Sequence, residues 1–250
     1  MTNVKGLFPG LPEPHVEPSA RWVRVRAADT WVADTRDALL LVWYGPGKLP
    51  TYCFPERDVR TDLFRPSEPG SYDLLVGGEV WPGVASRFRD PPRALAALDG
   101  YWTFTWDGRL RWFEEAMEVH VHARDPTKRV DTVPSERRVR VEVAGEVIAE
   151  SSRAHALFET HLPTRWYLPA EDVRMDRLVP TDTVTRCPYK GTARYWSVHA
   201  GGEVHDDIAW SYAEPIPECP RIAGLICFFN ERVDLVIDGV RQERPQSPWS

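Results

Sequence analysis

The stretch Phe-Pro-Glu-Arg-Asp-Val-Arg-Thr-Asp at residues 54–62 decides how this chain is organised, because it returns in altered form at residues 168–176 as Leu-Pro-Ala-Glu-Asp-Val-Arg-Met-Asp. The two stretches are 114 positions apart (168 − 54), and Pro66 and Pro180 keep the same spacing (180 − 66). Self-similarity at a fixed spacing is typical of repeated structural units. The sequence therefore predicts two diverged copies of one domain.

Further matches on both sides of this block locate a difference between the copies. The matching segments are 23–25 with 139–141 and 32–35 with 148–151, both 116 apart (139 − 23; 148 − 32), and 77–80 with 201–204, 124 apart (201 − 77). The change in spacing from 114 to 124 places ten additional residues of the second copy within Thr181–Arg194. The first copy therefore has no counterpart of the segment that contains Cys187–Ala193.

The domain boundaries follow from the extent of the repeat. Residues 123–137 hold Asp-Pro, Thr-Val-Pro and several charges, which is a composition typical of linkers. We therefore expect an N-terminal extension at 1–21, a first repeat at 22–122, a linker at 123–137, a second repeat at 138–240 and a C-terminal tail at 241–250.

Each copy has the pattern of short antiparallel strands. Apolar and polar residues alternate on both sides of Ala144-Gly145, and glycine pairs at 77–78 and 201–202 lie between apolar runs. Such patterns predict β-hairpins. The fold class expected is mainly β, with two similar small antiparallel β domains.

Two further local patterns predict another hairpin and the short helices. Asp107-Gly108 is expected to join strands at 102–106 and 109–112 as a hairpin. Proline near the start and glycine after the end predict one short helix per copy, at 92–98 and 217–223.

Composition narrows the class of protein. A formal net charge of −6, with basic residues scattered along the chain, makes nucleic acid an unfavourable partner. No apolar run approaches the length of a membrane span, and residues 1–21 lack the apolar core of a signal peptide, so a soluble, cytoplasmic protein without a membrane partner is expected. Four cysteines without a Cys-x-x-Cys pair are expected to be reduced thiols.

The second copy carries a specific set of residues between about Arg138 and Asp238. These are Ser152-Arg153-Ala154, Tyr167, Pro169-x-x-Asp172-Val173, Asp176, Cys187-Pro188-x-Lys190-Gly191-x-Ala193, Tyr195, Trp210-x-Tyr212, Pro215 and Pro217. In this order they resemble the family known as domain of unknown function 427. The first copy resembles it more weakly, since it lacks the Cys-Pro-x-Lys-Gly core and has Asp37 in place of Arg153.

The resemblance implies a compact domain with a strongly bent sheet, similar to the β-tent architecture of several small-ligand and zinc-binding modules. It implies no reaction. An older label for the family suggests nucleotidyl transfer, but the sequence has no G-x-x-x-x-G-K-[ST] motif, no G-x-G-x-x-G motif and no Asp-x-Asp pair beside a Gly-Ser motif.

The segment Cys187–Ala193 is the first candidate for function. Pro188 favours a turn, Gly191 permits close approach of the backbone, and Lys190 is placed to project a cation from a loop. Such a loop suits a small polar or anionic ligand. In the alternative, structural interpretation, Lys190 is a solvated cation and Cys187 is a small buried hydrophobic residue.

An aromatic set accompanies this segment, and its rings combine a large apolar face with a polar tip, as ligand pockets favour. In strands, Tyr195 and Trp196 are expected on opposite faces, whereas Trp210 and Tyr212 share one face. The alternative is that most of these rings belong to the core. The expected ligand-binding residues are Arg153, Tyr167, Asp172, Cys187, Lys190, Tyr195, Trp210 and Tyr212.

Arg153 and Asp172 have two interpretations. They either form an ion pair that orients the pocket or act as capping and salt-bridge residues. Asp58 repeats Asp172 in a copy without the Cys-Pro-x-Lys-Gly loop, which favours capping of the turn after Pro55 or Pro169.

Glu118, His120 and His122 place three potential metal ligands on one strand face, which is a weak signal for zinc by itself. We therefore expect no metal site and no cofactor.

Three functional hypotheses remain open at this point. The first is a small-molecule-binding protein whose second copy holds the ligand and whose first copy is a scaffold. The second is an enzyme with Cys187 or Lys190 as nucleophile and a tyrosine or Asp172 as proton shuttle. The third is an interaction protein that uses exposed aromatic strands such as Trp102–Trp112. Because duplicated domains often pack as a homodimer would, a monomer built as an intramolecular pseudo-dimer is expected.

Overall fold

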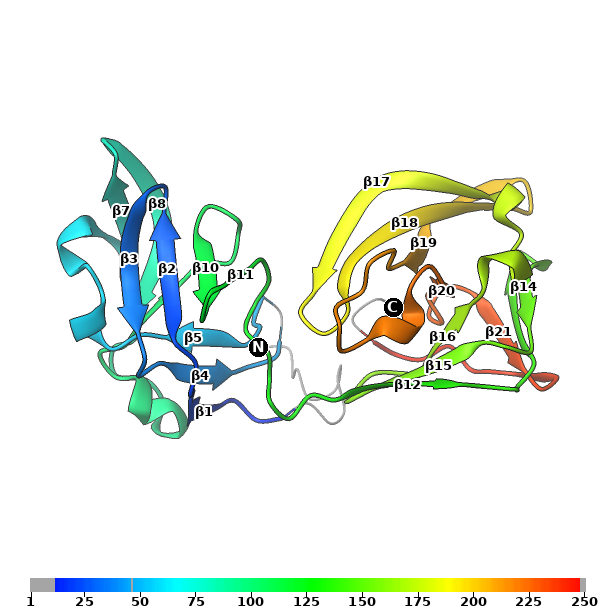
Figure 1. The fold of residues 1–250 in the computed structure, drawn as a ribbon, viewed down its shortest axis with the longest axis horizontal. Coiled ribbons are helices and arrows are strands. Elements are labelled where there is room, and N and C mark those ends of the chain that lie inside the picture. Colours follow the sequence, from blue (N-terminus) through cyan, green and yellow to red (C-terminus); the bar gives the residue numbers. More distant parts are fainter. Residues whose placement is uncertain (1–11, 46, 248–250) are drawn as a thin grey trace. The chain divides into compact units, whose positions relative to one another are not determined.

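The computed structural model describes residues 12–45 and 47–247, and these form mainly β-strands (Figure 1). The chain divides between Asp125 and Pro126 into two compact units, and each contains several antiparallel sheets. The mainly-β class with two similar domains is confirmed. Residues 1–11 of the expected extension and 248–250 of the expected tail lie outside the described residues.

The first unit contains three sheets, with strand orders β1-β4-β5, β11-β10-β2-β3 and β6-β7-β8-β9. Its strands are β1 (His15–Pro18), β2 (Val23–Ala27), β3 (Thr30–Thr35), β4 (Leu39–Val42), β5 (Thr51–Cys53), β6 (Phe64–Glu68), β7 (Ser71–Val76), β8 (Glu79–Arg87), β9 (Trp102–Phe104), β10 (Arg111–Glu114) and β11 (Met117–Val119). Its 3-10 helices are η1 (Glu56–Asp58), η2 (Thr61–Leu63) and η3 (Arg93–Leu98).

The second unit contains a seven-stranded sheet of order β12-β15-β16-β20-β19-β18-β17 and a four-stranded sheet of order β14-β13-β21-β22. Its strands are β12 (Val130–Pro134), β13 (Val139–Val143), β14 (Glu146–Ser151), β15 (His155–Glu159), β16 (Arg165–Leu168), β17 (Leu178–Cys187), β18 (Gly191–Ala200), β19 (Glu203–Ser211), β20 (Ile226–Phe228), β21 (Asp234–Ile237) and β22 (Val240–Arg241). Its 3-10 helices are η4 (Ala170–Asp172), η5 (Met175–Arg177) and η6 (Pro220–Ile222).

The two units have the same strand pairing, so each strand of the second unit carries a label eleven higher than its counterpart (12 − 1; 22 − 11). The strand pairing differs at one place, between β16 and β20 of the second unit and their counterparts β5 and β9 of the first. In the second unit β16 and β20 pair at two positions and join one large sheet. In the first unit Phe54 and Trp102 form a single bridge at the same place, so the sheet is divided there.

Local sequence explains most of these strands. In β2 and β13, valines alternate with charged residues, and every second side chain is buried. The predicted hairpins are confirmed, because Ala144-Gly145 joins β13 to β14, and the glycine pairs at 77–78 and 201–202 join β7 to β8 and β18 to β19. Both Gly201 and Gly202 have positive φ, which glycine adopts without steric cost.

The pairing predicted around Asp107-Gly108 is wrong. Residues 102–104 form β9, which pairs with β8, whereas 111–114 form β10, which pairs with β2. Asp107-Gly108 is therefore a connection between two sheets and not a hairpin turn. Trp102 and Trp112 are both buried, which also removes the exposed aromatic strand on which the interaction hypothesis depended.

Each repeat begins earlier than its sequence boundary indicates. β1 lies in the segment expected to be an extension and β12 in the segment expected to be a linker, yet both are hydrogen-bonded strands of their units. Pro18 pairs with Leu39 as Pro134 pairs with His155, and Pro18 and Pro134 are 116 positions apart (134 − 18). Because 116 is also the spacing of the neighbouring repeated segments, the sequence already contained evidence for the earlier start of each repeat.

The expected helices are short 3-10 segments. Residues 93–98 and 220–222 form η3 and η6, at the predicted places before Gly100 and Gly224. Two further 3-10 turns follow Pro55 and Pro169 at the repeated block, where the proline precedes the turn and an extended valine ends it. In the described part of the chain, no helix is long and apolar enough to cross a membrane.

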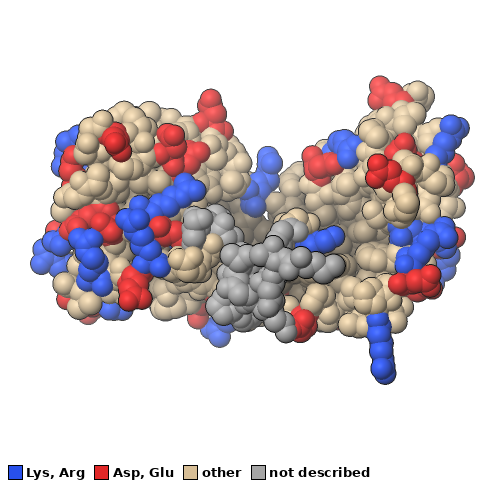
Figure 2. Space-filling model, turned by 180° about the vertical axis from the view of Figure 1, so that it is seen from behind, with Lys and Arg blue, Asp and Glu red and all other residues tan. Residues whose placement is uncertain are grey.

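The seven-stranded sheet has apolar residues on both faces. One face packs with the four-stranded sheet and includes Trp166, Leu168 and Phe228. The other face includes Tyr167, Trp210 and Cys227, and is covered by the segment that contains η6. The face of the molecule seen in Figure 2 carries acidic and basic side chains interspersed over both units.

Candidate functional site

The ten additional residues of the second repeat lengthen one hairpin. β17 and β18 have 10 residues each, whereas their counterparts β6 and β7 have 5 and 6. At about 3.3 Å per residue, the added length carries the turn roughly 15 Å further. The insertion therefore does not form a separate loop, and Lys190 lies in the turn that joins β17 to β18. Figure 1 shows these two strands as a long, curved hairpin.

The turn at this tip is held by its backbone. The amide of Lys190 donates to the carbonyl of Cys187 at 3.4 Å, and the carbonyl of Lys190 accepts from the amide of Ile216 at 3.0 Å. Gly191 has φ +113°, and a Cβ at this position would lie 3.3 Å from the Glu214 oxygen and the Ile216 nitrogen. Glycine is therefore required here both by the backbone angle and by the close approach of the chain.

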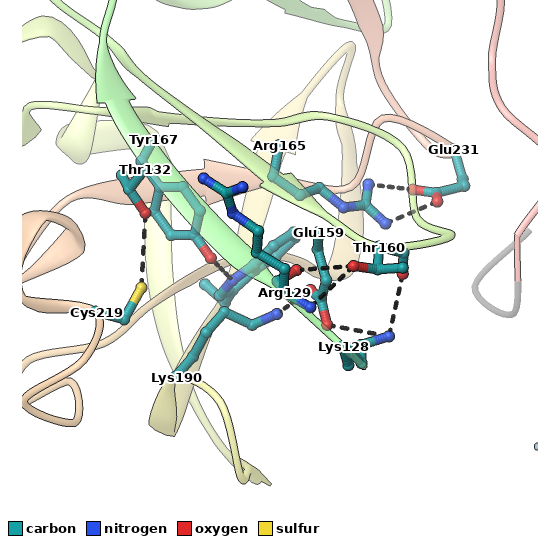
Figure 3. Close-up of polar contacts among 11 residues, drawn as sticks. Lys128, Arg129, Thr132, Glu159, Thr160, Arg165, Tyr167, Lys190, Cys219 and Glu231 are labelled. Atoms are coloured by element: carbon teal, nitrogen blue, oxygen red, sulfur yellow. Dashed lines mark hydrogen bonds and ion pairs between the residues drawn. The ribbon is translucent and has the colours of Figure 1, made fainter. Parts of the chain in front are cut away.

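The side chain of Lys190 does not extend into bulk water. Its ammonium forms an ion pair with Glu159, the last residue of β15, and Lys128 lies 3.4 Å from the other carboxylate oxygen (Figure 3). The exposed fractions of these side chains are 12% for Lys190, 5% for Glu159 and 11% for Lys128. We call these three residues the lysine cluster.

The backbone of β12 and β15 positions two members of the cluster. Val130 pairs with Glu159 across the strands, and beyond this pair the amide of Arg129 donates to the Thr160 hydroxyl at 2.9 Å. The Lys128 ammonium also donates to the Thr160 carbonyl at 3.3 Å. The tip of one hairpin thus meets the ends of two strands at the other side of the same sheet, which requires the sheet to curl strongly.

Nearby charge governs the protonation of Lys190. Burial alone would lower the pKa of Lys190, but the acidic groups of Cys187 and Glu159 reverse this effect and raise its pKa above the ordinary value. The ammonium therefore stays protonated at neutral pH. A protonated amine is not a nucleophile, which weakens the hypothesis of an enzyme that uses Lys190.

The aromatic set lies on one face of the seven-stranded sheet. Tyr167, Trp210 and Tyr212 are buried in one cluster, and Tyr195 is partly buried against it. The Trp210 indole N–H donates to the Tyr167 hydroxyl at 3.2 Å. Trp196 packs against the opposite cluster, so the expected alternation of faces is confirmed.

Burial also limits the chemistry of the tyrosines. It raises the pKa of both Tyr167 and Tyr212 well above the ordinary value. The charged forms of Cys187, Tyr195 and Glu159 add to this rise at Tyr212. Neither phenol is suited to exchange a proton near neutral pH.

A family model described as "Domain of unknown function (DUF427)" matches residues 15–119 and 131–239. The chain belongs to this family, in two copies. The matched segments contain β1 and β12, in agreement with the earlier start of each repeat. A comparison with curated proteins found no match.

Arg153 and Asp172 form an ion pair in the second DUF427 repeat. The guanidinium donates to both carboxylate oxygens at 2.9 and 3.0 Å, and the Ser151 hydroxyl donates to the same carboxylate at 2.7 Å. The Arg153 side chain is 62% exposed. Among the described residues, no hydrogen bond or ion pair joins this pair to the lysine cluster.

The first DUF427 repeat keeps the aspartate and its hydroxyl partner, but its arginine lies at a different position. The Thr35 hydroxyl donates to Asp58 at 2.7 Å, and Arg57 pairs with Asp37 at 2.5 Å. Asp37 occupies the position of Arg153, and Arg57 that of Glu171 (171 − 57 = 114). Positions 37 and 57 thus have the opposite signs of positions 153 and 171, which lie 3.8 Å apart, and both repeats keep an ion pair at this turn. Because the ion pair persists in a repeat without the long hairpin, it favours a structural role for Arg153 and Asp172.

A buried ion pair that the sequence did not indicate lies beside the aromatic set. Arg165 donates to both oxygens of Glu231 at 2.7 and 2.8 Å, and the exposed fractions of the side chains are 7% and 0% (Figure 3). The guanidinium carbon lies 5.6 Å from the Trp210 ring centre and 5.8 Å from that of Phe229. The sequence did contain one sign of this ion pair, because Arg165 is a charged residue at the start of a strand, Arg165–Leu168, that is wholly buried.

The weak metal signal at the end of the first repeat is not supported. Glu118 makes a two-pronged ion pair with Arg111, and the His120 ring nitrogen lies 3.9 Å from its carboxylate. Over the described ranges, no group of three or more His, Cys, Asp or Glu side chains is arranged to hold a metal ion.

Proposed function

We propose that the second DUF427 repeat binds a small polar or anionic molecule at the lysine cluster. The observation that carries this proposal is the sharing of one carboxylate, that of Glu159, by Lys128 and Lys190 at a largely buried position. Two ammonium groups around one carboxylate are the arrangement with which a carboxylate or phosphate of a ligand would be held. Binding would exchange the carboxylate of Glu159 for that of the ligand.

The aromatic set supports a place for the apolar part of such a ligand. The Tyr195 ring lies on the hairpin that carries Lys190, with its centre 6.4 Å from that of Phe229 and 6.5 Å from that of Trp210. Its hydroxyl is hydrogen-bonded to Thr185 at 2.9 Å. Rings that are partly exposed and have a polar tip suit contact with a small molecule.

The first repeat has neither the lysine cluster nor the aromatic set. This difference supports separate roles for the two copies. The first repeat has no counterpart of Lys190 and it replaces the surrounding charged and aromatic residues. The replacements, read from strand register and repeat spacing, are Trp43 for Glu159, Thr51 for Arg165, Cys53 for Tyr167, Ser71 for Tyr195, Ser86 for Trp210 and Asp107 for Glu231. We propose that the first repeat is a scaffold.

The proposal predicts opposite responses from two variants, measured as the shift in melting temperature that a ligand produces. The probes are inorganic phosphate, citrate and nucleoside monophosphates. Lys190→Met should abolish the shift of any probe that stabilises the wild type, because it removes a cation from the site. Glu159→Gln should enlarge that shift, because it removes the competing carboxylate and keeps the shape of the side chain.

Lys48→Met is the matched control, since Lys48 is an exposed lysine of the first repeat. It should respond as the wild type does. Identical ligand-induced shifts in the wild type, Lys190→Met and Glu159→Gln for every probe would contradict the proposed site.

A further inference from the structure

The lengthened hairpin also creates a long free edge. β17 is the last strand of the seven-stranded sheet and pairs on one side with β18. Among the described residues no strand pairs with its other side. An edge strand presents unpaired backbone N–H and C=O groups, which pair readily with another strand.

The side chains along this edge have an ordered charge pattern. Asp182, Val184 and Arg186 are all exposed on β17, with Val184 at 41%, and Asp182 lies where the pairing of β17 with β18 shifts register. Neither Asp182 nor Arg186 makes a hydrogen bond or ion pair with another described residue. By contrast, the hydroxyls of Thr181 and Thr183, on either side of Asp182, donate to Asp207 at 2.6 Å each.

We propose that β17 pairs antiparallel with β17 of a second copy of this chain, about a two-fold axis at Val184. In such a pair the numbers of facing residues sum to 368 (184 + 184), so Asp182 faces the partner's Arg186 and the reverse (182 + 186). Opposite charges that face one another across antiparallel strands stabilise the pair, and like charges destabilise it. The sequence around Val184 is therefore complementary to itself.

The location of these residues favours a closed dimer as the product. Asp182, Val184 and Arg186 lie in the segment that holds the ten additional residues, so the shorter β6 of the first repeat has no equivalent edge. One self-complementary edge per chain gives a two-fold dimer, whereas two different edges would permit open chains of subunits. The proposed dimer differs from the monomer expected from the sequence.

The experiment measures the self-association of the full chain by analytical ultracentrifugation. A single edge-strand interface is small, so dissociation constants on the order of 1–100 μM are expected and the range should extend to several hundred μM. Asp182→Arg and Arg186→Asp should each weaken dimerisation about tenfold or more, because two like-charged pairs replace two attractive ones. The double variant D182R/R186D should restore it.

An equimolar mixture of the two single variants provides a second test that does not depend on the double variant. Asp182→Arg has arginine at both positions and Arg186→Asp has aspartate at both, so the mixture should form a heterodimer more tightly than either variant forms a homodimer. Circular dichroism confirms that each variant is folded, and Arg65→Asp on the exposed edge strand β6 is the matched control.

Each result bears on the proposal. Weakening by both single variants with recovery in the double variant and in the mixture supports the β17 pairing. A wild-type chain that stays monomeric over the whole range overturns it. Association that is unaffected by the single variants, or that neither the double variant nor the mixture recovers, overturns it as well.

Discussion

Lys190 and Glu159 form an ion pair between the tip of the β17–β18 hairpin and the end of β15, although the two residues are 31 positions apart in the chain. Their strands are not neighbours in the sheet, since β16, β20, β19 and β18 lie between β15 and β17. The ion pair therefore joins two parts of the curled sheet that are far apart in its strand order. This relationship governs both the stability of the second repeat and access to the proposed ligand site.

Lys190→Met should destabilise the second repeat by about 2–3 kcal/mol, because a buried carboxylate that loses a partner is costly. This loss is smaller than the one expected when a buried carboxylate loses its last charged partner, because Lys128 still contacts Glu159. Urea denaturation of the full chain measures this effect. Lys48→Met should stay within about 0.5 kcal/mol of the wild type, as is usual for exposed sites. An equal, small effect of both variants would show that the ion pair contributes little to stability.

Gly191→Ala tests whether the hairpin tip is locked in place. The added methyl group would meet backbone atoms of Glu214 and Ile216 at 3.3 Å, in addition to the cost of a positive φ. Gly202→Ala is the control, because Gly202 also has positive φ but open space around its Cβ position. Thermal melting should show a loss of about 1–2 kcal/mol for the control and a clearly larger loss for Gly191→Ala. Equal losses of stability in the two variants would contradict the predicted steric contact at Gly191.

Glu231 is expected to make the second repeat sensitive to acid. Burial alone would raise the pKa of Glu231, but the hydrogen bonds and charge of Arg165 lower it below the ordinary value. A carboxyl group whose pKa is lower in the folded state stabilises the fold above its unfolded pKa of about 4.3, and this contribution is lost as the pH falls through the folded value. The wild type should therefore lose more stability between neutral pH and about pH 3 than Glu231→Gln does. The same loss of stability with falling pH in the wild type and in Glu231→Gln would contradict this prediction.

The exchanged charges of the two repeats predict a compensating pair of substitutions. Arg153→Asp alone should lower the melting temperature slightly, since the arginine is largely exposed and its loss leaves Asp172 without its charged partner. Adding Glu171→Arg reproduces the arrangement of Asp37 and Arg57 and should recover most of the loss. The melting temperature of the second repeat measures both steps. Absence of recovery in the double variant would argue against a shared structural role.

The repeat comparison predicted the hairpin tip well but not its surroundings. Cys187, Lys190 and Gly191 were singled out because an insertion is visible in the spacing of the repeated blocks. Glu159 and Lys128 were missed, since Glu159 aligns with Trp43 and no motif connects either residue to Lys190. Partners so distant in the chain meet only because of the curvature of the sheet, which no local pattern encodes.

The wrong prediction at Asp107-Gly108 has a similar origin. A tight turn between two apolar strands satisfies every local rule for a hairpin. Which strands then exchange backbone hydrogen bonds depends on the whole set of available edges, and here β9 pairs with β8 and β10 with β2. Local chemistry predicts that the chain turns, but not which strand it meets after the turn.

By itself, the sequence determined that this chain is a duplicated, mainly-β protein, that strands alternate with glycine turns, and that the second copy has ten additional residues within Thr181–Arg194. These properties follow from side-chain period, turn chemistry and repeat spacing, which act over a few residues. Only the tertiary structure decided that Lys190 meets Glu159, that Arg165 meets Glu231 and that Asp182 and Arg186 lie on a free edge. Those relationships depend on how far a seven-stranded sheet curls, which is a property of all its strands packed together.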